Sequence, residues 1–301
     1  MRSVAQALVV FVVAASGCST AGATNGLFAS TCPADGPEPE PDLAFAVNPV
    51  DVESYYDRLE AVVRGLPFRP LVRLQSGRFS LPMFHVGPAG KAGGRRLLVV
   101  AGLHGNEVAA PLAALGILAD VRRQPGHYEG VELHMVVPAN PVGLANQSRY
   151  DARGCDVDRD FSNFRTAEAR AIRDVVEQLR PELILSLHEG RREGFTVVGS
   201  ESVPERLLER VATAVGAAGI SLAGRTFLGV PLGAWGTRRE RWLGASGTLG
   251  AFADRRGIPA LESETQWSDP DLGNRIVAHV VATREVARYL RRSAVIGKES
   301  S

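Results

Sequence analysis

The sequence has almost no net charge and very little lysine. Its 34 basic residues are nearly balanced by 33 acidic residues, which gives a formal net charge of +1, and only Lys91 and Lys298 are lysines. A chain without a strong overall field is not drawn to nucleic acid through its charge. We therefore expect no nucleic-acid partner.

Long hydrophobic runs are also scarce, and the one clear run lies at the start of the chain. It extends from Val4 to Ala15 and is followed by Ser16-Gly17-Cys18. This run is shorter than the roughly 20 apolar residues of a transmembrane helix, and small residues follow it. Residues 1–18 therefore predict a secretory signal peptide, and the position of Cys18 resembles a bacterial lipoprotein signal. Simple secretion or an uncleaved anchor are the alternatives.

Cysteine is rare, with three residues in the chain. If Cys18 is acylated, Cys32 and Cys155 remain, and an oxidising compartment would permit a disulfide between them. Burial of Cys155 as a small apolar side chain is an equally good interpretation. Whether Cys18 is lipidated or the chain is simply secreted, we expect the protein in the periplasm or cell envelope, and lipidation would anchor it to the membrane through Cys18.

The rest of the chain divides into a tether and one folded domain. Residues 19–45 are rich in alanine, threonine, glycine, proline and acidic residues, which is typical of a flexible segment. Residues 46–301 show no internal repeat, and the chain is 45% hydrophobic, so they can bury a full core. We expect them to form one catalytic domain.

Strand and helix patterns alternate along this domain. The sequence predicts helices at 52–64, 107–123, 167–179, 204–215, 248–256 and 275–292, and strands at 71–75, 82–86, 97–101, 131–137, 183–187, 195–198 and 258–263. Residues 140–163 read as irregular. Such alternation favours an α/β fold with a mixed, mostly parallel central sheet and helices on both faces.

Reactive side chains follow three of the predicted central strands. His104, His188 and Glu264 come just after strands that end at Ala101, Leu187 and Ser263. Open α/β sheets bind ligands at the carboxyl ends of their strands, so we expect these side chains to converge.

His104 and Glu107 form a His-x-x-Glu pair at the start of a predicted helix. With His188 they supply two imidazoles and one carboxylate, a set that leaves one position of a tetrahedral zinc ion open for water. Alone, such a pair is more often a surface or capping pair, and His188 alone could be a histidine bonded to backbone. We expect the other four histidines to be structural: His85, His127, His134 and His279.

The order of several motifs resembles the zinc carboxypeptidase superfamily, which includes murein tripeptide amidases and the aspartoacylase and succinylglutamate desuccinylase branch. The matching segments are His104-Gly105-Asn106-Glu107, Asn140-Pro141-Val142-Gly143, Arg149-Tyr150-Asp151-Ala152-Arg153-Gly154, Asp156-Val157-Asp158-Arg159-Asp160-Phe161, Ala167-Glu168-Ala169-Arg170-Ala171, Leu187-His188-Glu189 and Gly257-Ile258-Pro259-Ala260-Leu261-Glu262-Ser263-Glu264.

The resemblance implies a role for each matching residue. It implies one zinc ion held by His104, Glu107 and His188. It implies that Glu264 is the general base, with Glu262 as a competitor because residues two apart on a strand share a face.

Further residues are assigned to the part of the site that binds substrate. Arg149 matches the arginine that stabilises charge on the carbonyl oxygen, and Arg153 is a weaker candidate. Arg159 matches the arginine that binds a substrate carboxylate, and a structural ion pair with a neighbouring aspartate is its alternative. Asp158 and Asn140 complete the predicted substrate-binding set.

Two positions depart from the pattern of the family. Asp158 stands where an asparagine is usual, so Arg159 is partly neutralised and the site is expected to prefer a zwitterionic or amine-bearing group. Leu243 stands where digestive members carry a tyrosine, and Trp235 and Trp242 could line the specificity pocket or simply pack.

These features predict a zinc metallopeptidase or amidohydrolase that cleaves an amide bond next to a carboxylate-bearing group. Murein peptides in the cell envelope are the first expected substrate, and N-acyl amino acids, cut by an aspartoacylase-type deacylase, are the second. A binding protein without turnover is the third possibility, but drift has no reason to preserve His104, Glu107, His188, Arg149 and Glu264 together.

Overall fold

A computed structural model describes Cys32 and residues 51–65, 68–74, 79–86, 94–224, 226–227, 230–231, 238–240 and 247–299. The expected signal peptide, Cys18 and the tether apart from Cys32 lie outside these residues. The elements are α1 (Val52–Val63), β1 (Phe68–Leu74), β2 (Phe79–Val86), β3 (Arg95–Ala101), α2 (Ala109–Arg123), η3 (Pro125–His127), β4 (Val131–Val136), α3 (Pro141–Asn146), η4 (Val157–Arg159), α4 (Ala167–Leu179), β5 (Leu183–Gly190), β6 (Thr196–Ser200), α5 (Glu205–Ala217), β7 (Thr226–Phe227), β8 (Val230–Pro231), β9 (Arg238–Glu240), α6 (Leu249–Asp254), β10 (Ala260–Gln266) and α7 (Leu272–Glu299).

One mixed sheet of eight strands organises the molecule, in the order β1-β2-β4-β3-β5-β10-β6-β9. The four central strands, β4, β3, β5 and β10, run parallel to one another. The pairs β1–β2, β2–β4 and β10–β6 are antiparallel. The fold is therefore the α/β arrangement with helices around a mostly parallel centre that the sequence predicts.

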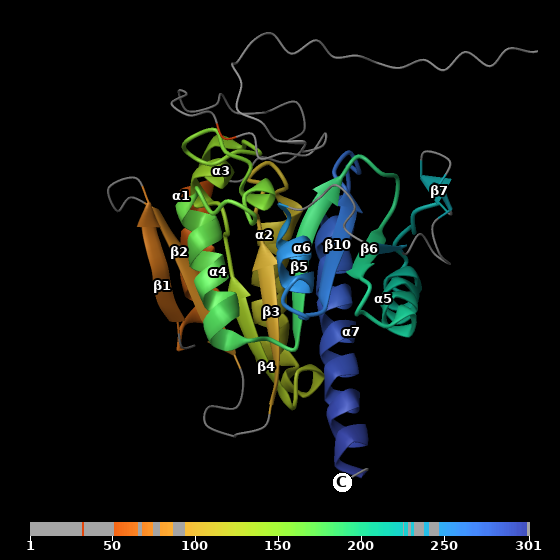
Figure 1. The fold of residues 1–301 in the computed structure, drawn as a ribbon. Helices are drawn as coiled ribbons and strands as arrows, with labels where there is room; N and C mark the ends of the chain where they lie inside the picture. The colour runs from red at the N-terminus through yellow and green to blue at the C-terminus, as the bar shows by residue number, and fades with distance from the viewer. Residues whose placement is uncertain are drawn as a thin grey trace, which may run out of the picture.

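Helices cover the sheet on both faces. Helices α1, α2, α5 and α7 contribute apolar side chains to one hydrophobic core, and α4 and α6 contribute to a second core on the opposite face. Figure 1 shows α4 and α6 in front of the central strands, with α2 and α7 behind them. Because β3 is sandwiched between these layers, its residues 97–101 are fully buried.

Helix α4 occupies the range that the sequence predicts, and its ends have local causes. Thr166 caps the first turn by accepting a hydrogen bond from the Ala169 backbone N–H, and Arg180 ends the helix in the left-handed conformation. Ala169, Ile172, Val175 and Val176 are buried at helical spacing.

Two strands near the expected site are longer than predicted. β5 continues to Gly190 and β10 to Gln266, so His188 and Glu264 lie within paired strands and not just beyond them. The segment 140–163, predicted to be irregular, contains the short helices α3 and η4. No helix in the described ranges has the length and apolar content of a transmembrane span.

Candidate metal centre

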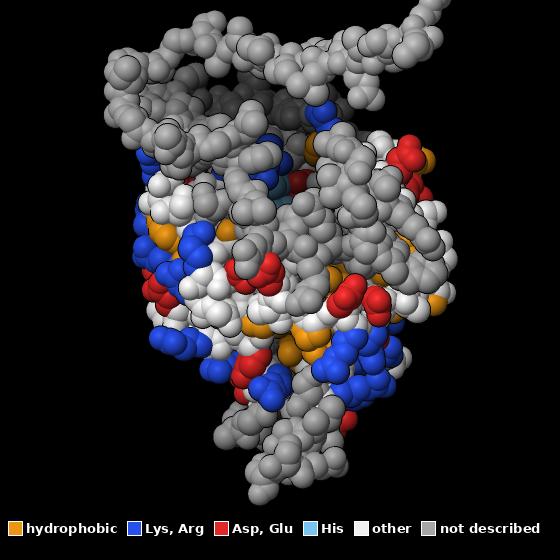
Figure 2. Space-filling view, turned by 45° about the vertical axis from the view of Figure 1, so that its right-hand side comes forward, with side chains coloured by type: hydrophobic (Ala, Val, Ile, Leu, Met, Phe, Trp, Pro, Cys, Tyr) orange, Lys and Arg blue, Asp and Glu red, His pale blue; other side chains and the backbone are white. Residues whose placement is uncertain are grey.

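Three segments that are distant in sequence meet at the carboxyl ends of the central strands. His104 lies in the turn after β3, Glu107 shortly before α2, and His188 near the end of β5. All three are at most 4% exposed. Figure 2 shows basic and acidic side chains beside a pale-blue histidine in a hollow near the top of the molecule.

The Glu107 carboxylate lies between the two imidazoles. Its Oε1 atom is 2.6 Å from Nδ1 of His104, and its Oε2 atom is 3.0 Å from Nδ1 of His188. The three potential ligand atoms all lie within 4.8 Å of one another. We call His104, Glu107 and His188 the central cluster, and the structure brings its members together as the sequence predicts.

Each imidazole of the central cluster is held by a second partner on its other ring nitrogen. Nε2 of His104 is 3.2 Å from Oδ1 of Asp156, and Nε2 of His188 is 2.7 Å from Oγ of Ser186. Such contacts fix the ring orientation and leave both Nδ1 atoms directed at Glu107. Sequence reasoning did not assign these supporting roles to Asp156 and Ser186, because Asp156 is 52 residues away from His104.

The donor chemistry of the central cluster fits a zinc ion. Two imidazole nitrogens and a carboxylate oxygen are the ligands of many catalytic zinc sites. Although burial opposes it, the Glu107 carboxylate raises the pKa of His104 and raises that of His188 to about 10. Burial would also raise the pKa of Glu107, but the two imidazoles hold it well below its usual range. The shifts therefore favour an ionised Glu107 carboxylate between two imidazoles that hold positive charge.

Glu264 is paired with His188 across the parallel strands β10 and β5, so their side chains lie on the same face of the sheet. Its carboxylate has no hydrogen-bond partner among the described residues. Burial raises the pKa of Glu264 above its ordinary value. A carboxylate in this position is suited to accept and return a proton.

Glu262 shares the face of Glu264 but lies deeper along β10, opposite Ser186. Burial, together with the charge of Asp158, raises its pKa to about 8. Its Oε1 atom is buried and makes no hydrogen bond within the described part of the chain. The structure therefore keeps both predicted carboxylates near the central cluster, with Glu264 nearer the carboxyl end of the strand.

Arg149 lies beside the central cluster and is held by the same aspartate as His104. Its Nε atom donates to Oδ2 of Asp156 over 2.8 Å, and its Nη1 atom is 3.9 Å from Oε1 of Glu107. The side chain is 27% exposed, so part of the guanidinium remains accessible to a substrate. This position suits a donor to a carbonyl oxygen.

Arg159 forms the ion pair with Asp158 that the sequence raised as an alternative. Nη1 of Arg159 is 2.6 Å from Oδ2 of Asp158, while Oδ1 of Asp158 accepts a hydrogen bond from the Leu249 backbone. Burial lowers the pKa of Arg159, but the surrounding carboxylates outweigh burial and raise it. Arg159 therefore presents a partly neutralised cation.

Asn140 stabilises the turn that contains His104. It is fully buried, its Oδ1 atom accepts from the Gly143 backbone, and its Nδ2 atom donates to the carbonyl of Leu103. A Cβ atom at Gly105 would lie 1.9 Å from the carbonyl carbon of Gly143, so only glycine permits this close packing. The structure thus gives Asn140 a positioning role, where the sequence predicted contact with substrate.

The remaining predicted residues lie elsewhere. Arg153 is exposed, and its backbone nitrogen donates to Asp151. Trp235, Trp242 and Leu243 lie outside the described residues. Cys32 and Cys155 form a disulfide, which joins Cys32 to the residue immediately before Asp156.

Part of the chain matches a known protein family. Residues 93–223 match the family model of the succinylglutamate desuccinylase/aspartoacylase catalytic domain. No curated protein matches the chain.

The fold is similar to those of several solved structures. A candidate metallopeptidase from Shewanella amazonensis SB2B is 25% identical with a TM-score of 0.69, over 80% of this chain and 93% of the other. One from Shewanella denitrificans OS217 is 24% identical with a TM-score of 0.68, over 80% and 91%. A metallo-carboxypeptidase from Burkholderia cenocepacia is 18% identical with a TM-score of 0.63, over 79% and 69%.

The family match spans β3 to α5 and includes all three residues of the central cluster. The protein is a metallohydrolase. Its fold is similar to that of solved metallopeptidases, and residues 93–223 resemble the catalytic domain of the succinylglutamate desuccinylase/aspartoacylase family.

Proposed function

We propose that the protein is a zinc-dependent amidohydrolase of the cell envelope that cuts an amide bond next to a carboxylate-bearing group in murein peptides. The observation that carries the proposal is the arrangement around the central cluster. Glu264 lies beside His188 on the neighbouring strand, and Nη1 of Arg149 lies 3.9 Å from Oε1 of Glu107. A general base and a charge-stabilising donor therefore flank the same metal ligands.

His104, Glu107 and His188 would hold a zinc ion, which when bound would lower the pKa of a water molecule and polarise the substrate carbonyl group. Glu264 takes the proton from the attacking water and delivers it to the departing amine nitrogen. Arg149 donates to the carbonyl oxygen as negative charge develops there. Asp156 orients both His104 and Arg149, so one carboxylate sets the positions of a ligand and of a donor.

The acids around Arg159 support a zwitterionic group as the substrate's recognition element. Asp158 pairs with Arg159 directly, and Asp156 contributes further negative charge nearby. A bare carboxylate would meet a cation that is already partly neutralised, whereas a group with both a carboxylate and an amine meets both signs of charge. The side-chain end of diaminopimelate in murein is such a group.

Export to the envelope is part of the proposal. The apolar leader in residues 1–18 directs secretion, Cys18 carries the lipid anchor, and residues 19–45 form the tether. The Cys32–Cys155 disulfide supports this location because disulfides persist in oxidising compartments.

A substrate panel tests the reaction. Zinc-loaded protein is incubated with γ-glutamyl-diaminopimelate peptides, with the same peptides lacking the distal amine, with ordinary C-terminal peptides and with N-acyl amino acids, and products are identified by mass spectrometry. We expect release of diaminopimelate and slower cleavage of the analogue without the amine. Cleavage of other amides but not of the diaminopimelate peptides would refute the murein assignment.

A matched variant tests the recognition element. Asp158→Asn keeps an oxygen for the Leu249 backbone N–H but removes the negative charge beside Arg159. We expect the preference for the amine-bearing substrate to fall by about tenfold, which corresponds to ~1.4 kcal/mol. An unchanged preference would show that Asp158 does not select the substrate.

The family match favours a second candidate, an N-acyl amino acid deacylase. Residues 93–223, which include the central cluster, match the succinylglutamate desuccinylase/aspartoacylase catalytic domain. Rapid hydrolysis of N-acetyl or N-succinyl amino acids, with no cleavage of peptides in the same panel, would establish the deacylase and exclude the peptidase.

A further inference from the structure

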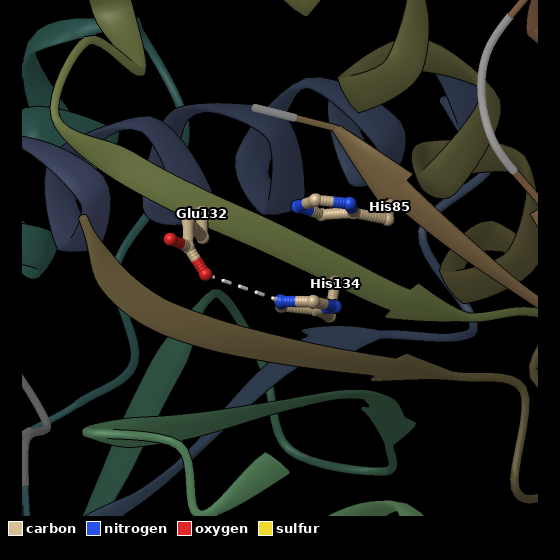
Figure 3. Close-up of side chains that lie close together, drawn as sticks. All are labelled: His85, Glu132 and His134. Carbon is tan, nitrogen blue, oxygen red and sulfur yellow. Dashed lines mark ion pairs between the residues drawn. The ribbon is translucent and has the colours of Figure 1, made fainter. Parts of the chain in front are cut away.

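A second group of metal-ligand side chains lies on the β2–β4 pair. His85 in β2 and His134 in β4 are direct cross-strand partners, and Glu132 lies two residues before His134 on the same face of the strand. Figure 3 shows the two rings lying over each other with Glu132 beside His134. Potential ligand atoms of the three residues lie within 4.8 Å of one another. We call them the β2–β4 cluster.

The two histidines of this cluster contact each other through their ring faces. The two imidazole rings are stacked, with centroids 4.5 Å apart and planes 7° from parallel. Nε2 of His134 is 3.9 Å from Oε2 of Glu132, which is too long for a hydrogen bond. Nε2 of His85 is buried and has no hydrogen-bond partner within the described ranges. A buried polar atom without a partner costs free energy, and a bound ligand would remove that cost.

We propose that His85, Glu132 and His134 form a binding site for one divalent transition-metal ion such as zinc or copper. Imidazole nitrogens suit both ions, and a carboxylate oxygen completes a three-ligand site with room for solvent. Around a tetrahedral zinc ion, ligand atoms lie roughly 3.3 Å apart, so the present group must close by about 1.5 Å at most. Tilting the two rings toward each other supplies this movement.

The surroundings leave room for Glu132 to take part. Its side chain is 24% exposed, which gives an ion a path from solvent. A Cβ atom at Gly94 would lie 2.8 Å from Cγ of Glu132, so glycine at this position makes space for the carboxylate arm. Arg96 is opposite Glu132 on β3, but its guanidinium is paired with Glu182. The cation closest in register therefore does not take the place of the metal ion.

The β2–β4 cluster is separate from the central cluster. His134 is level with Leu98 in β3, three residues or roughly 10 Å before the end of that strand at Ala101, and His104 lies in the turn beyond it. An ion here would connect β2, which carries the β1–β2 hairpin, to the parallel centre of the sheet. The site is a structural cross-link that stabilises the fold and takes no part in amide hydrolysis.

Metal titration of the purified protein tests the site. Protein stripped with a chelator is titrated with Zn²⁺ or Cu²⁺, and bound metal is counted by elemental mass spectrometry after removal of free ion. His85→Gln and Glu132→Gln are the test variants because both side chains are partly exposed, so the fold is retained. His127→Gln is the matched control, since His127 contacts Asp120 and belongs to neither cluster.

We expect the wild-type protein and His127→Gln to bind one equivalent more than either test variant. His188→Gln should lose the metal ion of the central cluster instead. The double variant His85→Gln/His188→Gln should therefore bind neither metal ion. Metal should also raise the melting temperature less in His85→Gln than in wild type. Wild-type stoichiometry in both His85→Gln and Glu132→Gln would overturn the proposal.

Discussion

The central cluster and the β2–β4 cluster contain the same ligand types on one sheet, yet their surroundings differ. In the central cluster each histidine is fixed by a second partner, Asp156 or Ser186, and all members are buried. In the β2–β4 cluster the histidine rings stack on each other and Glu132 is partly exposed. Two imidazoles and a carboxylate are therefore not enough to define a catalytic site.

The groups around the ligands make the difference. Glu264 and Arg149 lie next to the central cluster, where we propose that they move a proton and stabilise charge. Beside the β2–β4 cluster, the nearest cation in register, Arg96, is occupied by Glu182. The position of the central cluster at the carboxyl ends of parallel strands brings several loops within reach, which a position within the strands does not.

Removing one histidine from each cluster should give the largest contrast. We expect His188→Gln to lower kcat/KM by about 10⁴-fold or more, because the variant lacks a ligand for the ion that activates water. His134→Gln should leave kcat/KM within about twofold of wild type, since His134 touches nothing in the proposed reaction. Steady-state kinetics on the best substrate of the panel measures both. Equal losses in the two variants would break the distinction between the clusters.

The next contrast lies between the two carboxylates of β10. Glu264→Gln should reduce kcat by about 10³-fold while bound zinc is unchanged, because only proton transfer is removed. Glu262→Gln is the matched control on the same face of the strand, and we expect a much smaller loss. Kinetics combined with metal analysis separates the two effects. If Glu262→Gln caused the larger loss with zinc retained, the assignment of the base would be reversed.

Graded chelation should release the two metal ions at different chelator strengths. We expect the ion of the β2–β4 cluster to leave first, with an affinity about 100-fold weaker, because no hydrogen bond within the described residues orients Nε2 of His85. The metal retained after dialysis against chelators of increasing strength gives the two affinities. The release step that is absent in His85→Gln belongs to the β2–β4 cluster. Release of both ions in one step would show that orientation does not separate the clusters.

The smallest effects should come from the orienting partners themselves. Asp156→Asn should weaken zinc binding by about 10-fold to 100-fold and also lower kcat, because Asp156 holds Arg149 as well as His104. The Ser186 hydroxyl contacts His188. Ser186→Ala should weaken zinc binding by about tenfold or less. Zinc affinity by competition titration, compared with kcat, checks this order. A fall in zinc affinity without any change in kcat for Asp156→Asn would separate Arg149 from the reaction.

Local signals explain the elements that the sequence predicts well. The range of α4 follows from the capping Thr166 and from apolar residues at helical spacing. The extent of β10 was underestimated because Glu262 and Glu264 read as a polar strand end. In the structure these acids face the site, while Ser263 and Thr265 on the opposite face contact His279 of α7.

Long-range contacts explain what the sequence could not show. Nothing local indicates that Asp156 reaches His104, or that the register of β2 and β4 places His85 opposite His134. The two histidines were expected to be structural because each lies inside a strand pattern. The helix α3, by contrast, had a readable signal in the capping Asn140 followed by Pro141, which is favoured at the first helical position.

The pairing of Glu264 with His188 has a consequence for how the protein can change. These residues are direct neighbours on two hydrogen-bonded parallel strands. The distance between their backbones is therefore set by the spacing of neighbouring strands, about 4.8 Å. Loops at the mouth of the site can lengthen, shorten or exchange residues without altering that distance. New substrates can therefore be accepted by altering loops alone, while the spacing of the proposed base and the proposed metal ligand stays unchanged.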